Sequence, residues 1–155
     1  MLNKLIKKLV GEGKLKEQTA GIVQVEALLK QAILDLEEAK KISSIAERAT
    51  YILAYMAMLK GGRALLLIKG YVPTDGAQHK TVVEVTSAIL GDAYKDLTGQ
   101  FEIMRRKRNE MTYEAEGLLT LSDAKHAFHD AISLVKGILK EAKSQNPQLE
   151  LDFKL

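Results

Sequence analysis

The sequence has no cysteine, no tryptophan and only two prolines, and aromatic residues make up 5% of its 155 residues. The absence of cysteine excludes thiol catalysis, disulfide crosslinks and cysteine-based zinc sites. The scarcity of proline, together with only eleven glycines, argues against a fibrous or low-complexity chain. Hydrophobic residues account for 46% of the composition, which is enough for one folded domain with its own core.

Long uncharged apolar runs are also scarce. The most apolar stretch runs from Tyr51 to Leu59 and is followed by Lys60, so it falls short of the ~20 residues that a membrane-spanning helix needs. The segment from Met1 to Val10 has neither the apolar core nor the small-residue cleavage site of a signal peptide. We therefore expect a cytoplasmic protein without a membrane segment.

Positive charge is concentrated in two places. The net formal charge is +3, and residues 1–16 contain five lysines against one glutamate, so the rest of the chain is close to neutral. The exception is the internal cluster Arg105–Arg108. The basic N-terminal segment is also mildly amphipathic, which is compatible with contact to RNA, contact to an anionic membrane, or packing on the rest of the domain. Packing is the favoured interpretation of the three.

Apolar residues recur at steps of three and four along most of the chain, a periodicity typical of helices. The fold expected is all-α, an antiparallel up-and-down bundle of four to five helices. The domain organisation expected is a basic N-terminal segment (1–16), a helical bundle (17–145) and a C-terminal tail (146–155). The predicted helices cover residues 19–40, 44–69, 79–90, 92–116 and 120–143, with a loop at 71–78.

The second predicted helix is the most apolar and is expected to lie at the centre of the bundle. Ser44 and Glu47 have the spacing of a capping box at its start, and Gly70 supplies a left-handed end. Gly61 and Gly62 lower helix propensity by about 1 kcal/mol each relative to alanine. Their presence inside this helix predicts the close approach of a neighbouring helix.

The strongest candidate site is the stretch from Arg105 to Tyr113 in the fourth predicted helix. Helical spacing places Arg105, Arg108 and Asn109 on one side, and Tyr113 lies one turn beyond Asn109. Guanidinium groups bind phosphate, an amide orients a ligand, and a phenol stacks on a base or donates a proton. The residues predicted to bind nucleic acid are Arg105, Arg106, Lys107 and Arg108.

Neighbouring acids decide which of these cations remain available. Glu102 and Glu110 each have a spacing that suits a pair with Arg106. Arg105 and Arg108 have no acid at the favoured spacing, so they are the expected phosphate ligands. The alternative is a solvated basic helix face with Tyr113 in the core.

Four stretches of the chain are considered together: Arg48–Ala57, Ala64–Tyr71, Gln78–Thr81 and Arg105–Tyr113. In their order and spacing they resemble the HEPN domain family of small bacterial and archaeal helical proteins. The resemblance implies a bundle of four or five helices that forms a homodimer, often encoded beside nucleotidyltransferases, toxin–antitoxin genes or other defence genes. Many members are endoribonucleases that use no metal and no cofactor, with an arginine followed after four to six residues by a histidine.

Arg108 and Asn109 match the start of this motif. Tyr113 stands at the fifth position after Arg108, as in a branch of the family with Arg-Asn followed by Tyr, and no histidine occurs between Arg108 and His126. The resemblance therefore implies RNA or nucleotide binding, with Arg108, Asn109 and Tyr113 as the residues of a catalytic site. The general acid–base group usual near neutral pH is missing from the motif. The alternative is a non-catalytic interaction subunit that partners a nucleotidyltransferase or an antitoxin.

The histidines support no metal site. His126 and His129 lie three residues apart, a spacing at which two imidazoles can share a metal ion, but no third ligand is identified. They are interpreted as surface residues. His79, at the start of the third predicted helix, is interpreted as a structural or capping residue.

The tail contains Gln148, Leu151 and Phe153 in the order Gln-x-x-Leu-x-Phe. This hexamer resembles the peptide by which bacterial proteins bind the replication sliding clamp, in which an extended segment inserts leucine and phenylalanine into an apolar pocket. The alternatives are a tail that folds back on the bundle or one that pairs in a dimer.

Overall fold

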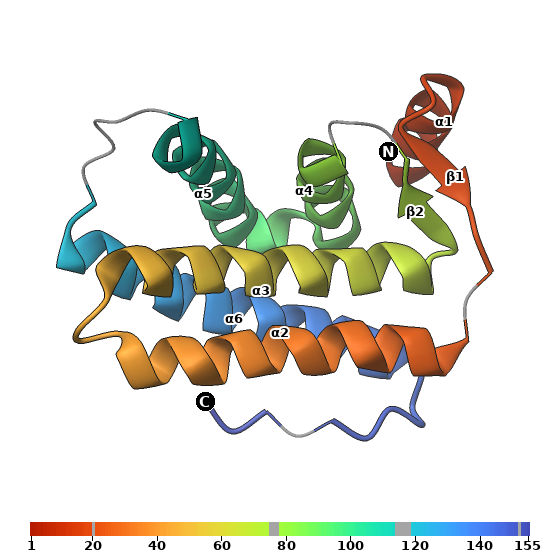
Figure 1. Ribbon diagram of the computed structural model, residues 1–155. Helices are drawn as coiled ribbons and strands as arrows, with labels where there is room; N and C mark the ends of the chain where they lie inside the picture. The colour runs from red at the N-terminus through yellow and green to blue at the C-terminus, as the bar shows by residue number, and fades with distance from the viewer. Residues whose placement is uncertain (20, 75–77, 114–118, 152) are drawn as a thin grey trace.

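The computed structural model describes residues 1–19, 21–74, 78–113, 119–151 and 153–155, without the side chains of residues 112 and 113. The expected all-α helical bundle is confirmed (Figure 1). A short 3-10 turn, Asp92–Tyr94, precedes the fifth helix. The helices are α1 (Leu2–Gly11), α2 (Ile22–Ile42), α3 (Glu47–Ile68), α4 (Gln78–Leu90), α5 (Lys95–Tyr113) and α6 (Leu121–Gln145), and the strands are β1 (Leu15–Glu17) and β2 (Tyr71–Pro73).

The five helices α2 to α6 form two layers. In Figure 1, α2, α3 and α6 lie alongside one another, while α4 and α5 rest on the opposite side of α3 from α2 and run across it. Gly91 and the 3-10 turn connect α4 to α5, so the free ends of this helical hairpin are the start of α4 and the end of α5. These two ends lie well apart in Figure 1, above α3.

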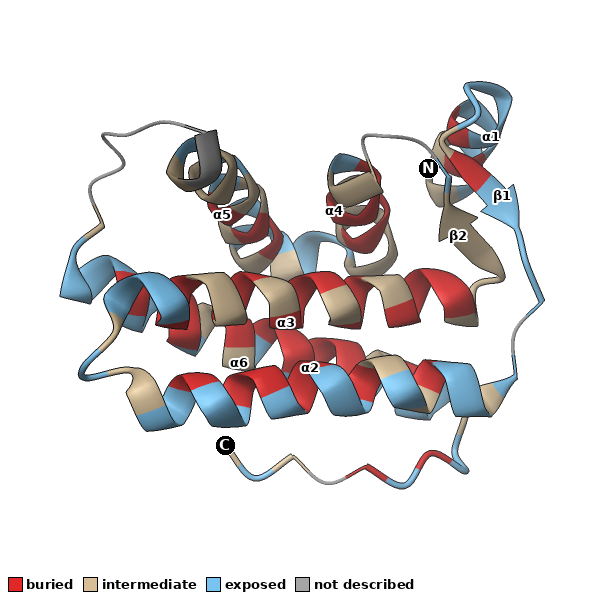
Figure 2. Ribbon diagram, in the orientation of Figure 1, coloured by how far each residue is buried: buried red, intermediate tan, exposed pale blue. Residues whose placement is uncertain are grey.

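Helix α3 lies at the centre of the fold, as its composition predicts. Figure 2 shows it buried along most of its length, while α2 exposes its outer face. A Cβ atom at Gly61 would lie 3.1 Å from Ile138 Cδ1, and one at Gly62 would lie 2.7 Å from Val82 Cγ1. The predicted close approach therefore occurs on two sides, with α6 at Gly61 and α4 at Gly62.

The apolar character of α3 corrects the expectation that the most apolar stretch of the chain is too short to span a membrane. Among the described residues, Glu47–Ile68 is the one helix long and apolar enough to cross a membrane by length and composition. However, 67% of the most apolar stretch of this helix is buried inside the bundle. Burial against other helices therefore accounts for the composition of α3, as in the core helix of a globular domain.

The predicted capping box at Ser44 is not formed. Ala46 is the N-cap of α3 and provides no side-chain hydrogen bond. The reason is that the Ala46 N–H donates to Ile42 O at 2.9 Å, so the turn after α2 continues past Ser44. The start of α6 does have a capping box, in which the Asp123 N–H donates to Thr120 Oγ1 and the Thr120 N–H donates to Asp123 Oδ2.

The segment predicted as a loop at 71–78 begins with a strand. β2 pairs with β1 in antiparallel register, Leu15 opposite Pro73 and Glu17 opposite Tyr71. This small ribbon holds α1 beside α4. The basic N-terminal segment therefore packs on the domain, since Leu9 and Leu15 are each only 2% exposed within the main core.

The C-terminal tail folds back along the α2 and α6 helices, which is one of the alternatives drawn from the sequence. Leu149 and Leu151 are buried, and the Lys143 ammonium donates to Leu151 O at 2.8 Å. Phe153 is half-buried below the ammonium of Lys136. Clamp docking through Gln148, Leu151 and Phe153 stays a prediction, and it requires Leu151 to leave this contact.

Candidate functional site

Three aromatic rings from three helices meet above the middle of α3. The Tyr55 hydroxyl of α3 lies 2.9 Å from His79 Nδ1 at the start of α4, and their ring centroids are 5.8 Å apart. The ring of Phe101 on α5 lies 5.9 Å from that of Tyr55. Tyr55 and Phe101 are fully buried, so this contact fixes the positions of α4 and α5 relative to α3.

The Tyr55–His79 pair is uncharged near neutral pH. Burial is the main reason that the pKa of Tyr55 is raised to about 12. Burial also lowers the pKa of His79 below its usual value, and the positive charges of Arg108, Arg63 and Arg105 lower it further. Because Nδ1 of His79 is occupied by the Tyr55 hydroxyl, Nε2 is the ring nitrogen left for a ligand.

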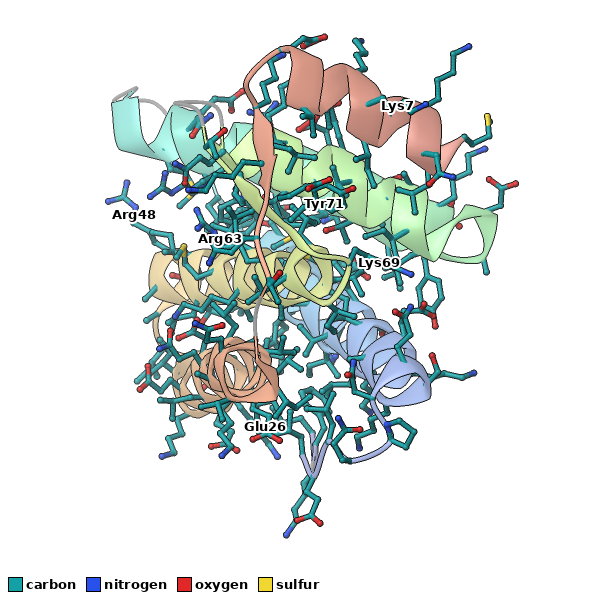
Figure 3. All side chains as sticks on the ribbon, turned by 90° about the vertical axis from the view of Figure 1, so that its right-hand side faces the viewer. Lys7, Glu26, Arg48, Arg63, Lys69 and Tyr71 are labelled. Atoms are coloured by element: carbon teal, nitrogen blue, oxygen red, sulfur yellow. The ribbon has the colours of Figure 1, made fainter. Side chains whose placement is uncertain are left out.

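Three arginines, Arg63, Arg105 and Arg108, act electrostatically on both residues of this pair, and we call the five residues together the arginine site. Arg63 lies on the side of α3 that faces α4, where its Nη2 donates to Gln78 Oε1 at 3.0 Å (Figure 3). Arg105 and Arg108 lie one turn apart on α5, and both act electrostatically on Tyr55 and on His79. All three arginine residues are half-buried, and partial burial strengthens the electrostatic interaction of a cation with a ligand.

The residues of the predicted basic cluster lie on separate faces of α5. Arg105 and Arg108 face the arginine site, whereas Arg106 is exposed. Arg105 is not without an acid, because its Nε donates to Glu102 one turn earlier on the helix. The pairing predicted for Glu102 with Arg106 is therefore wrong, and Glu102 balances one of the three arginines.

Two other predicted residues are only partly placed. Asn109 is half-buried next to Arg108 on α5. Tyr113 is the last residue of α5, and its side chain lies outside the described residues. The role predicted for Tyr113 therefore stays a prediction.

A cavity lies between α3, α5 and α6, and none of the five residues of the arginine site lines it. It has a volume of about 410 Å³ and is lined in part by Lys107, Tyr51 and His126. Asp130 also lines it, and burial raises the pKa of that carboxyl. His126 and His129 are exposed, and no cluster of three metal-binding side chains occurs in the part of the chain that the structure describes.

Sequence reasoning missed three of the five residues of the arginine site. Tyr55 and Arg63 lie in the most apolar helix, and Tyr55 has the spacing of a core residue. A signal for Arg63 was present, because a cation inside an apolar helix is rarely buried without a partner or a function. His79 was interpreted as a structural or capping residue, and no sequence pattern connects it to Tyr55, which lies 24 positions earlier.

The chemistry of the arginine site suits a phosphate-bearing ligand. Guanidinium groups bind phosphate oxygens through paired, charge-assisted hydrogen bonds. The first turn of α4, which carries His79, adds the positive end of a helix dipole on the same side. Comparisons of the chain with protein-family models, curated proteins and solved structures find no match, so the site is interpreted from its own geometry.

His79 provides a direct test of this geometry. We expect the imidazole of His79 to titrate below pH 6.5 in the folded protein. Arg108→Ala should raise the pKa of His79, because among the three arginines Arg108 has the largest lowering effect on it. The unfolded chain binds this proton more readily, so stability falls as the pH drops below 6.5. Proton NMR titration of the histidine rings measures the midpoint, and Arg106→Ala is the control. A midpoint at or above 6.5, or one insensitive to Arg108→Ala, would contradict the arrangement.

Proposed function

We propose that the protein binds RNA or nucleotides by their phosphate groups at the arginine site. One observation carries the proposal: Arg63 of α3 donates to Gln78 beside His79, and Arg105 and Arg108 follow Phe101 on α5, whose ring packs on Tyr55, the hydrogen-bond partner of His79. A phosphate bound there would accept charge-assisted hydrogen bonds from these guanidinium groups.

The sequence resemblance to the HEPN domain family supports the same proposal and extends it. We propose a cytoplasmic homodimer of the toxin–antitoxin or defence type, in which Arg108 and Asn109 contact the ligand. RNA cleavage is the reaction to test at this site. His79 brings to it the imidazole that the stretch Arg108–Tyr113 lacks, and a neutral imidazole accepts a proton near neutral pH.

Substitution of the arginines tests the binding proposal. We expect Arg63→Gln and Arg108→Gln each to weaken binding of a fluorescein-labelled single-stranded RNA decamer by about tenfold, because each removes a charge-assisted hydrogen bond to phosphate. Fluorescence anisotropy at low ionic strength measures the affinity. The matched control is Arg106→Gln, which removes the same charge from the exposed face of α5 and is expected to change affinity by less than about twofold.

The outcome separates the proposal from the interaction-subunit alternative. If all three variants bind the decamer as the unmodified protein does, the arginine site does not bind RNA. Equal losses for Arg106→Gln and Arg108→Gln would mean that only the net charge of α5 matters, which also contradicts the assigned site. A selective loss at Arg63 and Arg108 supports it.

A further inference from the structure

Helix α1 has two unlike faces. Ile6 and Leu9 are buried against the rest of the domain, and Leu2 and Leu5 pack beside them. The lysines of the helix, Lys4, Lys7 and Lys8, are all exposed. Because the apolar face is already covered by protein, insertion into a membrane would require α1 to detach from the domain.

The segment is held in a fixed position relative to α4. Leu15 of β1 is 2% exposed, and β1 is paired with β2. The Thr74 hydroxyl donates to Gly13 O at 2.8 Å, and the Thr74 N–H donates to Lys14 O at 3.1 Å. We call residues 1–17 the lysine arm, since the exposed or half-exposed side chains Lys4, Lys7, Lys8, Lys14 and Lys16 lie on a rigid support.

Positive charge continues from the lysine arm to the arginine site. The Glu12 carboxylate lies 3.0 Å from Lys14 Nζ and 3.9 Å from Lys8 Nζ. Its pKa is lowered first by the hydrogen bond to Lys14 and also by the charge of Lys80 on α4. The end of α1 is close to the start of α4, because the two helices are in contact and Thr74, four residues before Gln78, is hydrogen-bonded to Gly13 and Lys14.

The order of the helices completes this path. Figure 1 shows α1, α4 and α5 on the same side of α3, with α4 in the middle. In Figure 3, Lys7 lies on the outer surface of α1 and Arg63 lies below, between α3 and α4. Gln78, two residues before Lys80, is bound by Arg63. Lys80 therefore lies between the end of α1 and the arginine site, since it acts on Glu12 and directly follows His79.

We propose that the lysine arm is a second contact surface for RNA, and that the ligand is a strand of several nucleotides rather than a single nucleotide. The inference rests on the proposed function and deepens it. A single-stranded RNA carries one phosphate per nucleotide, so a strand bound at the arginine site continues over the start of α4 and reaches the lysines. A mononucleotide is too short to contact both surfaces.

A variant of the arm tests this inference through the dependence on ligand length. The triple variant Lys4→Gln, Lys7→Gln and Lys8→Gln keeps residues with good helix propensity and removes three exposed charges. We expect it to bind a single-stranded RNA dodecamer about tenfold more weakly at low salt, with its salt-dependence slope reduced by about 2. Its affinity for 5′-AMP is expected to stay unchanged.

A matched control and a vesicle assay make the outcomes distinct. The control variant removes three exposed lysines from α2, Lys30, Lys40 and Lys41, and is expected to bind the dodecamer as the unmodified protein does. If the arm variant also binds it unchanged while Arg108→Gln does not, the arm inference is overturned and the proposed function stands. If Arg63→Gln and Arg108→Gln leave both ligands bound as before, the proposed function fails. Arm-dependent binding to vesicles of phosphatidylglycerol and phosphatidylcholine, without arm-dependent RNA binding, would show that the arm serves a membrane and would also overturn the inference.

Discussion

Replacement of Phe101 by alanine is expected to lower the free energy of unfolding by about 3–5 kcal/mol, the usual cost of removing a fully buried aromatic side chain. Phe101 has no exposed surface, and its ring lies 5.9 Å from that of Tyr55. The substitution leaves a cavity at the contact between α5 and α3. Urea denaturation measures the loss.

Ile103→Ala is the matched control for this substitution. Ile103 lies two residues further along α5 and is 58% exposed, so we expect its loss to cost less than about 0.5 kcal/mol. Equal costs for the two variants would show that α5 is not fixed by the aromatic contact. Under conditions where Phe101→Ala remains folded, its His79 titration reports whether Arg105 and Arg108 still lie near the imidazole.

The helices themselves could be predicted from the sequence because each buries one continuous stripe of apolar residues. Gly61 and Gly62 also indicated close packing correctly, since two glycines weaken a buried helix unless a neighbour uses the space. The strands β1 and β2 could not be predicted. Three residues are too few to establish an alternating pattern, and their pairing joins segments more than fifty positions apart.

Only the part of the arginine site that lies on a single helix, α5, could be predicted from the sequence. Arg105 and Arg108 share a face of α5, so helical spacing alone placed them together. Arg63 and His79 join them because α4 and α5 cross α3 instead of running along it, and no local pattern encodes that crossing. The pairing of Arg105 with Glu102 was missed because spacings of three and four are both available to an acid on a helix.

The tail shows the same limit. The order of Gln148, Leu151 and Phe153 resembles a docking peptide, yet alternating leucines also suit a segment that covers its own domain. Leu149 and Leu151 are buried against the described bundle, and the apolar groove that accepts them is formed by helices distant in sequence. The sequence of the tail therefore shows which side chains are apolar enough to be buried, but it does not determine whether they are buried in this domain or in a partner protein.

The contact between α3 and α4 depends on Gly62, and we expect Gly62→Val to lower the free energy of unfolding by about 2–3 kcal/mol. A Cβ atom at this position would lie 2.7 Å from Val82 Cγ1 and 2.8 Å from Thr86 Oγ1. Both neighbours are β-branched, fully buried side chains of α4, and such side chains have few rotamers into which they can move. We therefore expect α4 to be displaced in order to relieve the strain. Thermal and urea denaturation measure the loss.

Gly99→Val on α5 is the matched control, because a Cβ atom there meets nothing within 4 Å. We expect it to change stability by no more than about 0.5 kcal/mol. A displaced α4 also separates His79 from Tyr55 and from Arg63, so in Gly62→Val the pKa of His79 should move back toward 6.5 and RNA binding should weaken. Gly62→Val with unchanged stability and an unchanged His79 titration would show that α4 does not need the glycine to hold the imidazole in the arginine site. A loss of stability without a change at His79 would separate the packing of the helices from the geometry of the site.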